Sequence, residues 1–553
     1  MAASRLKEAF LHLSQHSVES VQNGIAFTEW DQYMHVDRPI ETKLVEKMDE
    51  IDSVGGGIIL LIGSAGDGKS HLISRIKQMS DWGESCFYND ATASSSPKKT
   101  AVDTLKEALV PFNDVNIQTT NKKLVLAINL GKLNTFIEDD EVKCSFSEIV
   151  KATSPIFDDD DTTPPIETKR IKVVVFSDSQ AFEFSLNKES DYPVNAEFLD
   201  LILDKVVSQS DSNPFYRAYL QDKANESNHI DPLLLNFELL SLPEIRQTIS
   251  MTIIEAIIRC KLNITPREFL DFIYSIIVFP HYAEYEEKKD FFDALLPNLF
   301  YCGSSNTIQR AISTLDPLKH SSIEHDKQLS ILFTSYSIPT DYLNGNLPEK
   351  LIKRTNGFYS NNGRDIERTI KFVFRLNHLL DYHSENPIYI SYLSLLRGIF
   401  AHNKQKMQEI YDLVQKAIPR HYGSYYSKNN MIPLNIQGGR YRMFATLSLA
   451  PEIINAPYSE DNPSEFLLRF DMKWKFHDES VNLRMDYQLY SYLYDLNHGK
   501  LALSYENEKD LSFSRFIRQL IDKCDCANEI TIVRSDPAEF KLTETTFGNI
   551  QLQ

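Results

Sequence analysis

The sequence predicts an α/β fold built on a parallel sheet, followed by a helical region and then by an α+β region. Short apolar runs of strand length alternate with helical segments in the first part of the chain, which is typical of a parallel sheet. From residue 197 to residue 379 the apolar pattern is helical almost throughout. After residue 387, aromatic-rich alternating stretches such as 466–476 indicate strands between short helices. We therefore expect four parts: an N-terminal helical segment (1–52), a sheet-forming core (53–200), a helical lid or bundle (201–385) and an α+β domain (386–553).

The charge and the apolar pattern exclude two broad classes of protein. The chain has 553 residues and a formal net charge of −19. A protein that covers DNA with its whole surface is basic, so any contact with nucleic acid must be local or made through a partner. No apolar run reaches the ~18 residues of a membrane-spanning helix, and the first residues lack the pattern of a signal peptide. We therefore expect no membrane contact.

The cysteines and histidines do not form a recognisable site. The six cysteines are scattered, apart from Cys524 and Cys526. A disulfide framework would be denser and a zinc site would need paired knuckles, so free thiols in a reducing, cytoplasmic compartment are expected. The fourteen histidines are dispersed, and no Ser-His-Asp, Cys-His or nuclease-type acidic cluster stands out. We assign no nuclease centre.

The elements of the predicted core follow in order from Arg38-Pro39. Proline suits the first helical turn, and apolar residues recur with helical spacing over 40–51. Three glycines at 55–57 end this pattern, and 58–62 is a buried strand. A glycine-rich loop and a helix over 69–79 come next. Further strands are expected at 86–88, 124–128 and 171–176, with surface loops at 91–99 and 158–165.

The glycine-rich loop matches the phosphate-binding pattern Gly-x-x-x-x-Gly-Lys-Ser. A buried strand precedes it and a helix follows it, which is the context that the motif requires. Glycines let backbone N–H groups point at phosphate oxygens, and the helix N-terminus adds partial positive charge. The lysine reaches the β- and γ-phosphates and the serine hydroxyl ligates Mg²⁺. The sequence therefore predicts an α/β P-loop NTPase fold of AAA/STAND-like type that binds ATP and Mg²⁺ through Gly63, Ser64, Ala65, Gly66, Asp67, Gly68, Lys69 and Ser70.

Hydrolysis also needs a polar side chain at the end of a neighbouring strand, to hold Mg²⁺ or to orient water. In one arrangement Asp178, after the strand at 171–176, joins Ser70 in holding Mg²⁺ through water. In the other, which we favour, Asn129 takes the Walker B position and Ser177 or Asp178 is the polar sensor. The simplest alternative makes Asn129 and Asp178 turn residues. Leu130 follows Asn129 where an acid would support rapid turnover.

Two further polar residues are candidates for the same site. Asp90 ends the strand at 86–88, so it is expected at the carboxyl edge of the sheet, where ligands collect; it would support the waters of Mg²⁺ or cap a loop. Thr265 is expected to cap a helix that has Pro266 at its first position and Glu268 at its third. Arg267, in the first turn of that helix, is a candidate sensor of the γ-phosphate or an ordinary surface residue.

The segment 402–442 is basic, whereas the chain as a whole is acidic. It holds seven lysines and arginines against two acidic residues, and tyrosines are interspersed among them. Bases stack on aromatic rings and phosphates pair with Arg and Lys, so this segment is a candidate DNA contact. A protein interface or an ordinary helix followed by a loop is the alternative. The residues concerned are Lys404, Lys406, Lys416, Arg420, Lys428, Arg440 and Arg442, with Tyr411, Tyr422, Tyr425, Tyr426 and Tyr441.

Five motifs in this order resemble the DptF (DndF) family of DNA phosphorothioation-dependent restriction proteins. They are Gly-Ser-Ala-Gly-Asp-Gly-Lys-Ser-His-Leu at 63–72, Tyr-Asn-Asp-Ala-Thr at 88–92, Ala-Ile-Asn-Leu-Gly at 127–131, Thr-Pro-Arg-Glu-Phe-Leu-Asp-Phe-Ile-Tyr at 265–274 and Phe-Gly-Asn at 547–549. The resemblance covers most of the chain, and the first motif is the most specific on its own.

The resemblance implies a role in bacterial antiviral defence. Companion enzymes of that family place sulfur in the host DNA backbone, and a set of three restriction proteins acts on DNA that lacks the mark. It implies nucleotide binding at 63–70, a complex with the partner restriction proteins and contact with DNA through that complex. An ATP-gated switch or scaffold with little hydrolysis is one alternative. A P-loop remodelling or chaperone ATPase unrelated to DNA is the other.

Overall fold

The structure is a computed structural model, and its contacts divide the chain into two compact units. The first unit comprises residues 1–183 and 196–383, and the second comprises 184–195 and 384–553. The residues that the structure describes are 4–19, 29–89, 100–157, 165–176, 184–187, 189–226, 230–320, 322–335, 338–339, 342, 347–361, 363–422, 431–434, 441–446, 450–452, 469–476, 479–501, 511–523, 529–534, 539–544 and 550–552.

A four-stranded parallel sheet forms the centre of the predicted core, as the alternating pattern indicated. Its strands are β1 (Gly57–Gly63), β2 (Phe87–Tyr88), β3 (Lys123–Asn129) and β4 (Ile171–Val175). They lie in the order β2-β3-β1-β4, so β1 has a parallel neighbour on each side. All four occur where the sequence predicted strands. All seven residues of β1 are buried, which explains why its sequence is a continuous apolar run.

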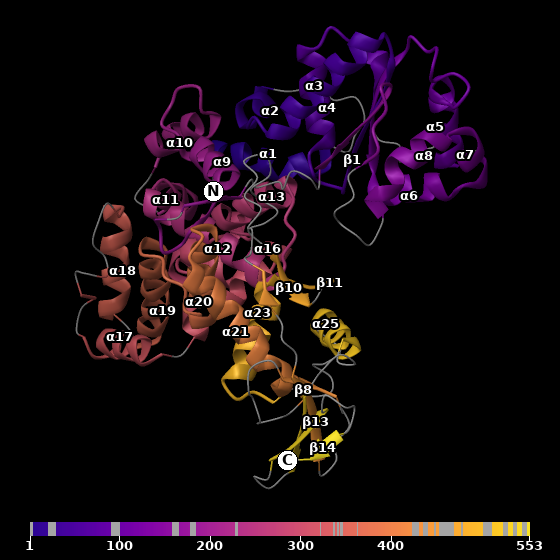
Figure 1. Ribbon diagram of the computed structural model, residues 1–553. Coiled ribbons are helices and arrows are strands. Elements are labelled where there is room, and N and C mark those ends of the chain that lie inside the picture. The colour runs from indigo at the N-terminus through magenta and orange to yellow at the C-terminus, as the bar shows by residue number, and fades with distance from the viewer. Residues whose placement is uncertain are drawn as a thin grey trace. The chain divides into compact units, whose positions relative to one another are not determined.

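Helices cover both faces of this sheet (Figure 1). Because side chains alternate along a strand, Ile59 and Leu61 of β1 join one apolar cluster and Ile58, Leu60 and Ile62 join another. The first cluster includes residues of α3 (Pro39–Val54) and α4 (Lys69–Met79). The second includes residues of α5 (Ala101–Leu109), α6 (Leu130–Glu138), α7 (Asp140–Ser145) and α8 (Ser147–Thr153).

The remainder of the first unit is helical, as predicted. The N-terminal helix α1 (Arg5–Glu19) packs against α10 and α13 of this region. Its other helices are α2 (Glu29–Met34), α9 (Glu197–Val207), α10 (Pro214–Ala224), α11 (Pro232–Leu240), α12 (Pro243–Cys260), α13 (Pro266–Ile277), α14 (Glu287–Asp290), α15 (Leu296–Cys302), α16 (Thr307–Ile312), α17 (Ile323–Thr334), α18 (Glu349–Asn361) and α19 (Gly363–Leu380).

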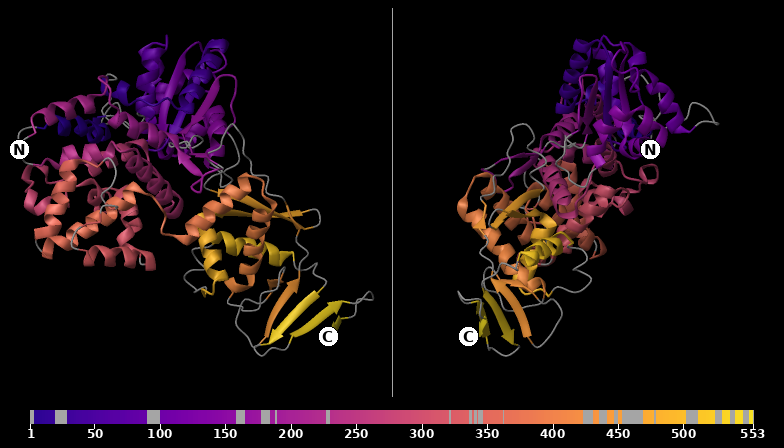
Figure 2. Two further views of the ribbon diagram at one scale, coloured as in Figure 1. Left: turned by 90° about the vertical axis from the view of Figure 1, so that its left-hand side faces the viewer. Right: turned by 45° about the vertical axis from the view of Figure 1, so that its right-hand side comes forward.

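The second unit combines helices with antiparallel strands, and the strands of its largest sheet lie side by side (Figure 2). That sheet has the order β14-β13-β12-β8-β7, and a smaller one has the order β11-β10-β9. The elements are α20 (Pro387–Phe400), α21 (Lys404–His421), β7 (Met431–Pro433), β8 (Tyr441–Thr446), β9 (Ala450–Pro451), β10 (Arg469–Phe476), β11 (Glu479–Asp486), α23 (Tyr487–Asn497), α25 (Leu511–Asp522), β12 (Glu529–Arg534), β13 (Glu539–Glu544) and β14 (Ile550–Leu552).

Two short strands were not predicted. β5 (Phe184–Leu186) and β6 (Val194–Ala196) form a two-stranded sheet, and residues 184–195 group with the C-terminal unit by their contacts. Three-residue strands are too short to show a period in the sequence. Among the helices that the structure describes, none is long and apolar enough to cross a membrane.

Candidate nucleotide-binding site

The glycine-rich loop joins the end of β1 to the start of α4. The predicted helix over 69–79 is found with these bounds. Gly66 and Gly68 have φ of 91° and 96°, a left-handed conformation that glycine adopts without steric cost. Gly68 is the N-cap residue of α4 and has no side chain to cap it. The N–H groups of the first turn can therefore serve a bound anion.

Hydrogen bonds within residues 64–69 stabilise the conformation of the glycine-rich loop. The ammonium of Lys69, which is only 9% exposed, donates to the carbonyl oxygen of Ser64 at 2.5 Å. The backbone N–H of Ser64 donates to the carboxylate of Asp67. Burial raises the pKa of Asp67, although the Ser64 N–H and the charges of Lys69 and Arg38 act in the opposite direction. The loop thus combines a buried cation with backbone donors at a helix N-terminus.

Arg38 fastens the residues before α3 to this loop. Its Nη1 donates to the carbonyl oxygen of Asp67 at 3.1 Å. The guanidinium also lies over the rings of Phe176 and Phe198, 5.4 and 5.7 Å from their centroids. The sequence identified Arg38 only as the start of a helix, because nothing in its neighbourhood signals a contact with residue 67.

Ser70 and Asn89 meet at the carboxyl edge of the sheet. The Ser70 hydroxyl donates to the Asn89 side-chain oxygen at 3.2 Å. Asn89 directly follows β2, so the predicted gathering of strand ends at this edge is observed for this residue. Asp90, which the sequence placed at the same edge, lies outside the described residues. The Ser70 hydroxyl thus has a neutral amide beside it.

Asn129 is placed directly beside the loop. It is the last residue of β3 and pairs in register with Gly63, the last residue of β1. It is also the N-cap residue of α6, and its side chain makes no capping hydrogen bond. Gly131 lies within α6, so Asn129 stands at the junction of a strand and a helix. Ser177 and Asp178 lie outside the part of the chain that the structure describes.

The start of α13 touches the glycine-rich loop. Thr265 and Glu268 form the predicted capping box: the Thr265 N–H donates to the Glu268 carboxylate at 2.9 Å, and the Glu268 N–H donates to the Thr265 hydroxyl at 3.3 Å. A Cβ atom on Gly66 would lie 2.9 Å from the Thr265 Oγ1. Arg267, the candidate sensor, lies two residues from this contact.

Burial affects the ionisable residues of this helix start. Burial lowers the pKa of Arg267, and the nearby Asp271 opposes that shift. Burial raises the pKa of Asp271 to about 6 despite the attraction of Arg267. A guanidinium that is partly withdrawn from water interacts more strongly with an incoming anion than an exposed one would.

Gly66→Ala is expected to weaken ATP binding by about tenfold and to destabilise the chain. The added methyl would press on Thr265, and a left-handed conformation costs a non-glycine residue on the order of 1–3 kcal/mol. Titration calorimetry and urea denaturation measure the two effects. Gly83→Ala is the matched control, because a Cβ there meets nothing within 4 Å. Equal behaviour of the two variants would contradict the tight approach of α13 to the loop.

The basic segment 402–442 is only partly available for contact with a partner. Tyr411 is 2% exposed and donates to the carbonyl oxygen of Glu452 at 2.7 Å, so its expected role in base stacking is wrong. Arg420 donates to the carbonyl oxygen of Asn497 at 2.5 Å, and Arg442 donates to that of Tyr422 at 3.1 Å. Each of these two guanidinium groups therefore already donates to a backbone carbonyl within the second unit, which the sequence did not reveal.

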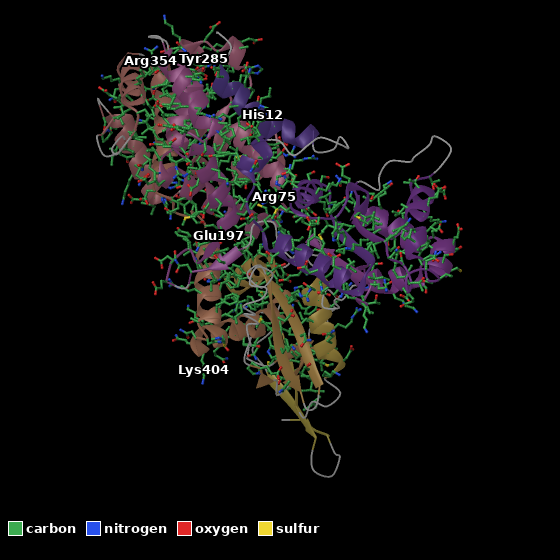
Figure 3. All side chains as sticks on the ribbon, turned by 90° about the horizontal axis from the view of Figure 1, so that it is seen from above. His12, Arg75, Glu197, Tyr285, Arg354 and Lys404 are labelled. Carbon is green, nitrogen blue, oxygen red and sulfur yellow. The ribbon has the colours of Figure 1, made fainter. Side chains whose placement is uncertain are left out.

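Two other residues of this segment are exposed on the surface. Lys404 begins α21 and is exposed (Figure 3). Tyr441 is 48% exposed on β8. Tyr425, Tyr426, Lys428 and Arg440 lie outside the described residues. The exposed basic surface that the structure shows is therefore smaller than the sequence suggested.

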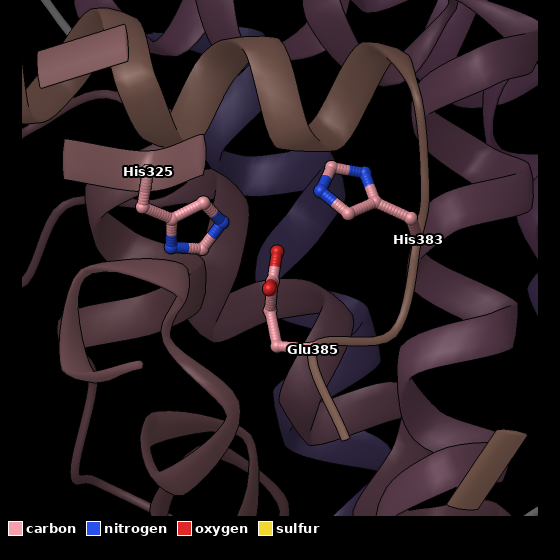
Figure 4. A group of neighbouring side chains, drawn as sticks. All are labelled: His325, His383 and Glu385. Carbon is pink, nitrogen blue, oxygen red and sulfur yellow. The ribbon is translucent and has the colours of Figure 1, made fainter. Parts of the chain in front are cut away.

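His325 and His383 of the first unit come close in space although they are distant in sequence (Figure 4). Their ring centroids are 6.4 Å apart. The Nδ1 of His325 bonds the carbonyl oxygen of His320 at 2.8 Å, and the Nδ1 of His383 bonds that of Asp381 at 3.2 Å. Glu385, drawn with them, belongs to the second unit. Each ring therefore makes a local hydrogen bond to a backbone carbonyl a few residues earlier in the chain.

Comparison of the chain with models of protein families, with curated proteins and with solved structures gives no match.

Proposed function

We propose that the chain binds ATP with Mg²⁺ at residues 63–70 as a P-loop NTPase of AAA/STAND-like type. The observation that supports this most directly is the loop itself: it leaves a buried parallel strand, turns through two left-handed glycines and enters α4 at Lys69. That arrangement directs backbone N–H groups and a buried ammonium at one point. The direct test is titration calorimetry of ATP and Mg²⁺ into the wild-type chain and into Lys69→Ala.

The residues of the site have distinct roles in this proposal. The N–H groups of the loop and of the first turn of α4 bind phosphate oxygens, and Lys69 neutralises the β- and γ-phosphates. The Ser70 hydroxyl, which donates to Asn89, would hold Mg²⁺ through a lone pair of its oxygen. Arg38 and Thr265 hold the loop from two sides. Arg267 senses the γ-phosphate from the start of α13.

We further propose that this nucleotide site serves a phosphorothioation-dependent restriction system, in which the chain acts with partner restriction proteins on DNA that lacks the sulfur mark. The order of the five motifs supports this role. At a net charge of −19 the chain alone is repelled by duplex DNA at long range, so contact with DNA is made through the complex. Cleavage is left to a partner, because no nuclease centre is assigned.

A nucleotide-gated switch with little hydrolysis is the second candidate function. It is favoured by the side chains at the carboxyl edge of the sheet. Asn129 ends β3 and Asn89 follows β2, and both are neutral amides where a carboxylate would organise Mg²⁺ and water. A protein of this kind binds ATP tightly, changes its partner contacts and releases phosphate slowly.

Asn129→Ala distinguishes the two candidates. If the chain hydrolyses ATP with Asn129 at the Walker B position, the variant should release phosphate at least about tenfold more slowly than the wild type. Its affinity for ATP should change little. Asp178→Asn, measured alongside, tests the other arrangement. Asn134→Ala is the control, because Asn134 also lies on α6, where its amide donates to Glu138 at 3.4 Å. Steady-state phosphate release and calorimetry give the two readouts.

The outcomes are separable. A wild-type chain that binds ATP but releases no phosphate above background is a switch. Wild-type rates in both Asn129→Ala and Asp178→Asn would remove both residues from the mechanism.

A further inference from the structure

A compact group of metal-ligand atoms lies beside the first turn of α4. His35 belongs to the link between α2 and α3, Asp37 follows in the same link, and Glu41 lies in the first turn of α3. The Nε2 of His35 is 3.0 Å from the Oδ1 of Asp37 and 3.1 Å from the Oε2 of Glu41. The three ligand atoms all lie within 4.8 Å of one another. Nothing in the proposed nucleotide site uses them.

These separations suit a small tetrahedral ion. Ligands placed ~2.0–2.1 Å from zinc at tetrahedral angles are about 3.3 Å apart, close to the two distances from His35. One imidazole and two carboxylates are a donor set that zinc accepts, whereas Mg²⁺ and Ca²⁺ prefer oxygen alone. Water would complete the coordination.

His71 supports the orientation of His35 from the other side of its ring. The Nδ1 of His35 and the Nε2 of His71 are 3.0 Å apart, and the two rings stack with centroids separated by 5.3 Å. When the Nδ1–H of His35 donates to His71, its Nε2 lone pair faces the two carboxylates. Metal-bound histidines almost always engage their second nitrogen in this way.

Two carboxylates at one point need positive charge or hydrogen-bond donors to balance them. Two carboxylates approach one imidazole nitrogen, and the other oxygen of Glu41 lies 3.8 Å from the Nε of Arg75. Burial strengthens this requirement, because the side chains of His35 and Glu41 are only 8% and 13% exposed. A divalent metal ion bound by the three side chains would supply that charge.

We propose that His35, Asp37 and Glu41 form a zinc-type site for a divalent transition metal, with His71 as the residue that positions His35. The site joins the segment before α3 to the residue that follows Ser70 on α4. None of its three ligands belongs to the proposed nucleotide site at residues 63–70.

Zinc titration of the chelator-dialysed full chain, without nucleotide, tests the proposal. We expect the wild-type chain to bind one zinc ion that Asp37→Asn and Glu41→Gln each weaken at least tenfold. Cobalt should give the visible absorption of a tetrahedral ion in the wild type and lose it in both variants. Asp49→Asn is the matched control, because it removes one exposed carboxylate from the same helix.

Asp37→Asn is the decisive variant. Its side chain is 91% exposed, so the substitution leaves the fold intact, which circular dichroism confirms. A chain that binds no zinc, or zinc binding of unchanged stoichiometry and affinity in Asp37→Asn and Glu41→Gln, would overturn the site. Failure of ATP binding would leave these results unaffected, so the two proposals are tested separately.

Discussion

ATP binding is expected to fall at least about 100-fold in Lys69→Ala, since truncating a buried charged partner costs on the order of 3 kcal/mol. Lys69 is 9% exposed and is held at the loop by the carbonyl of Ser64. Its ammonium is the one that neutralises the β- and γ-phosphates in the proposed complex. Titration calorimetry with ATP and Mg²⁺ measures the loss, and the same variant should fail to restrict unmarked DNA in cells that contain the partner proteins.

Lys77→Ala is the control for this prediction. Lys77 lies in the last turn of the same helix, is exposed and contacts the ring of Phe87 rather than the loop. It should bind ATP as the wild type does. A folded Lys69→Ala chain with undiminished affinity would show that residues 63–70 are not the nucleotide site. If Lys69→Ala loses ATP binding as expected but still restricts unmarked DNA, the nucleotide site is not needed for restriction.

Asp316→Ala is expected to destabilise the first unit by about 3–5 kcal/mol, because it leaves a buried charge without its partner. The carboxylate of Asp316 accepts two hydrogen bonds from Arg375, at 3.1 and 2.6 Å. The side chains are 3% and 11% exposed, and Arg375 also donates to Asn298 at 2.9 Å. This network connects α15, the turn at Asp316 and α19. Urea denaturation followed by circular dichroism measures the loss.

A second ion pair on α19 provides the comparison. Arg368 donates to Asp293 at 2.7 Å, but their side chains are 38% and 62% exposed. Because water screens exposed pairs, Asp293→Ala should cost only ~0.2–1 kcal/mol. Similar losses in the two variants would mean that burial does not set the strength of the Asp316–Arg375 pair.

Local features of this protein could be predicted from the sequence because neighbouring residues determine them. The apolar run 58–62, the glycine-rich loop and the helix over 69–79 were predicted and are observed. Pro39 begins α3 and Thr265 forms a capping box with Glu268, again as predicted. Each depends on dihedral preferences or hydrogen bonds that span only a few residues.

Predictions from composition were less successful where burial decides the role of a side chain. Tyr411 belongs to a basic, tyrosine-rich segment, yet it packs inside the second unit. Arg420 and Arg442 are basic residues of the same segment whose donors bind backbone carbonyls. Charge and residue type along the chain do not reveal which side of a helix or strand faces the interior when the partner elements are 30 or more residues away, as Asn497 is from Arg420.

The sequence by itself determined the glycine-rich loop, the four parallel strands and the helices α3 and α4, since these follow from local periodicity and turn chemistry. Only the tertiary structure decided which distant residues meet that loop. The strand order β2-β3-β1-β4 places Asn129 beside Gly63, the end of β2 brings Asn89 to Ser70, and the packing of α13 sets Thr265 against Gly66. The same packing brings His35 to His71. Such contacts depend on how whole elements bury their apolar faces together, and no short stretch of sequence contains that information.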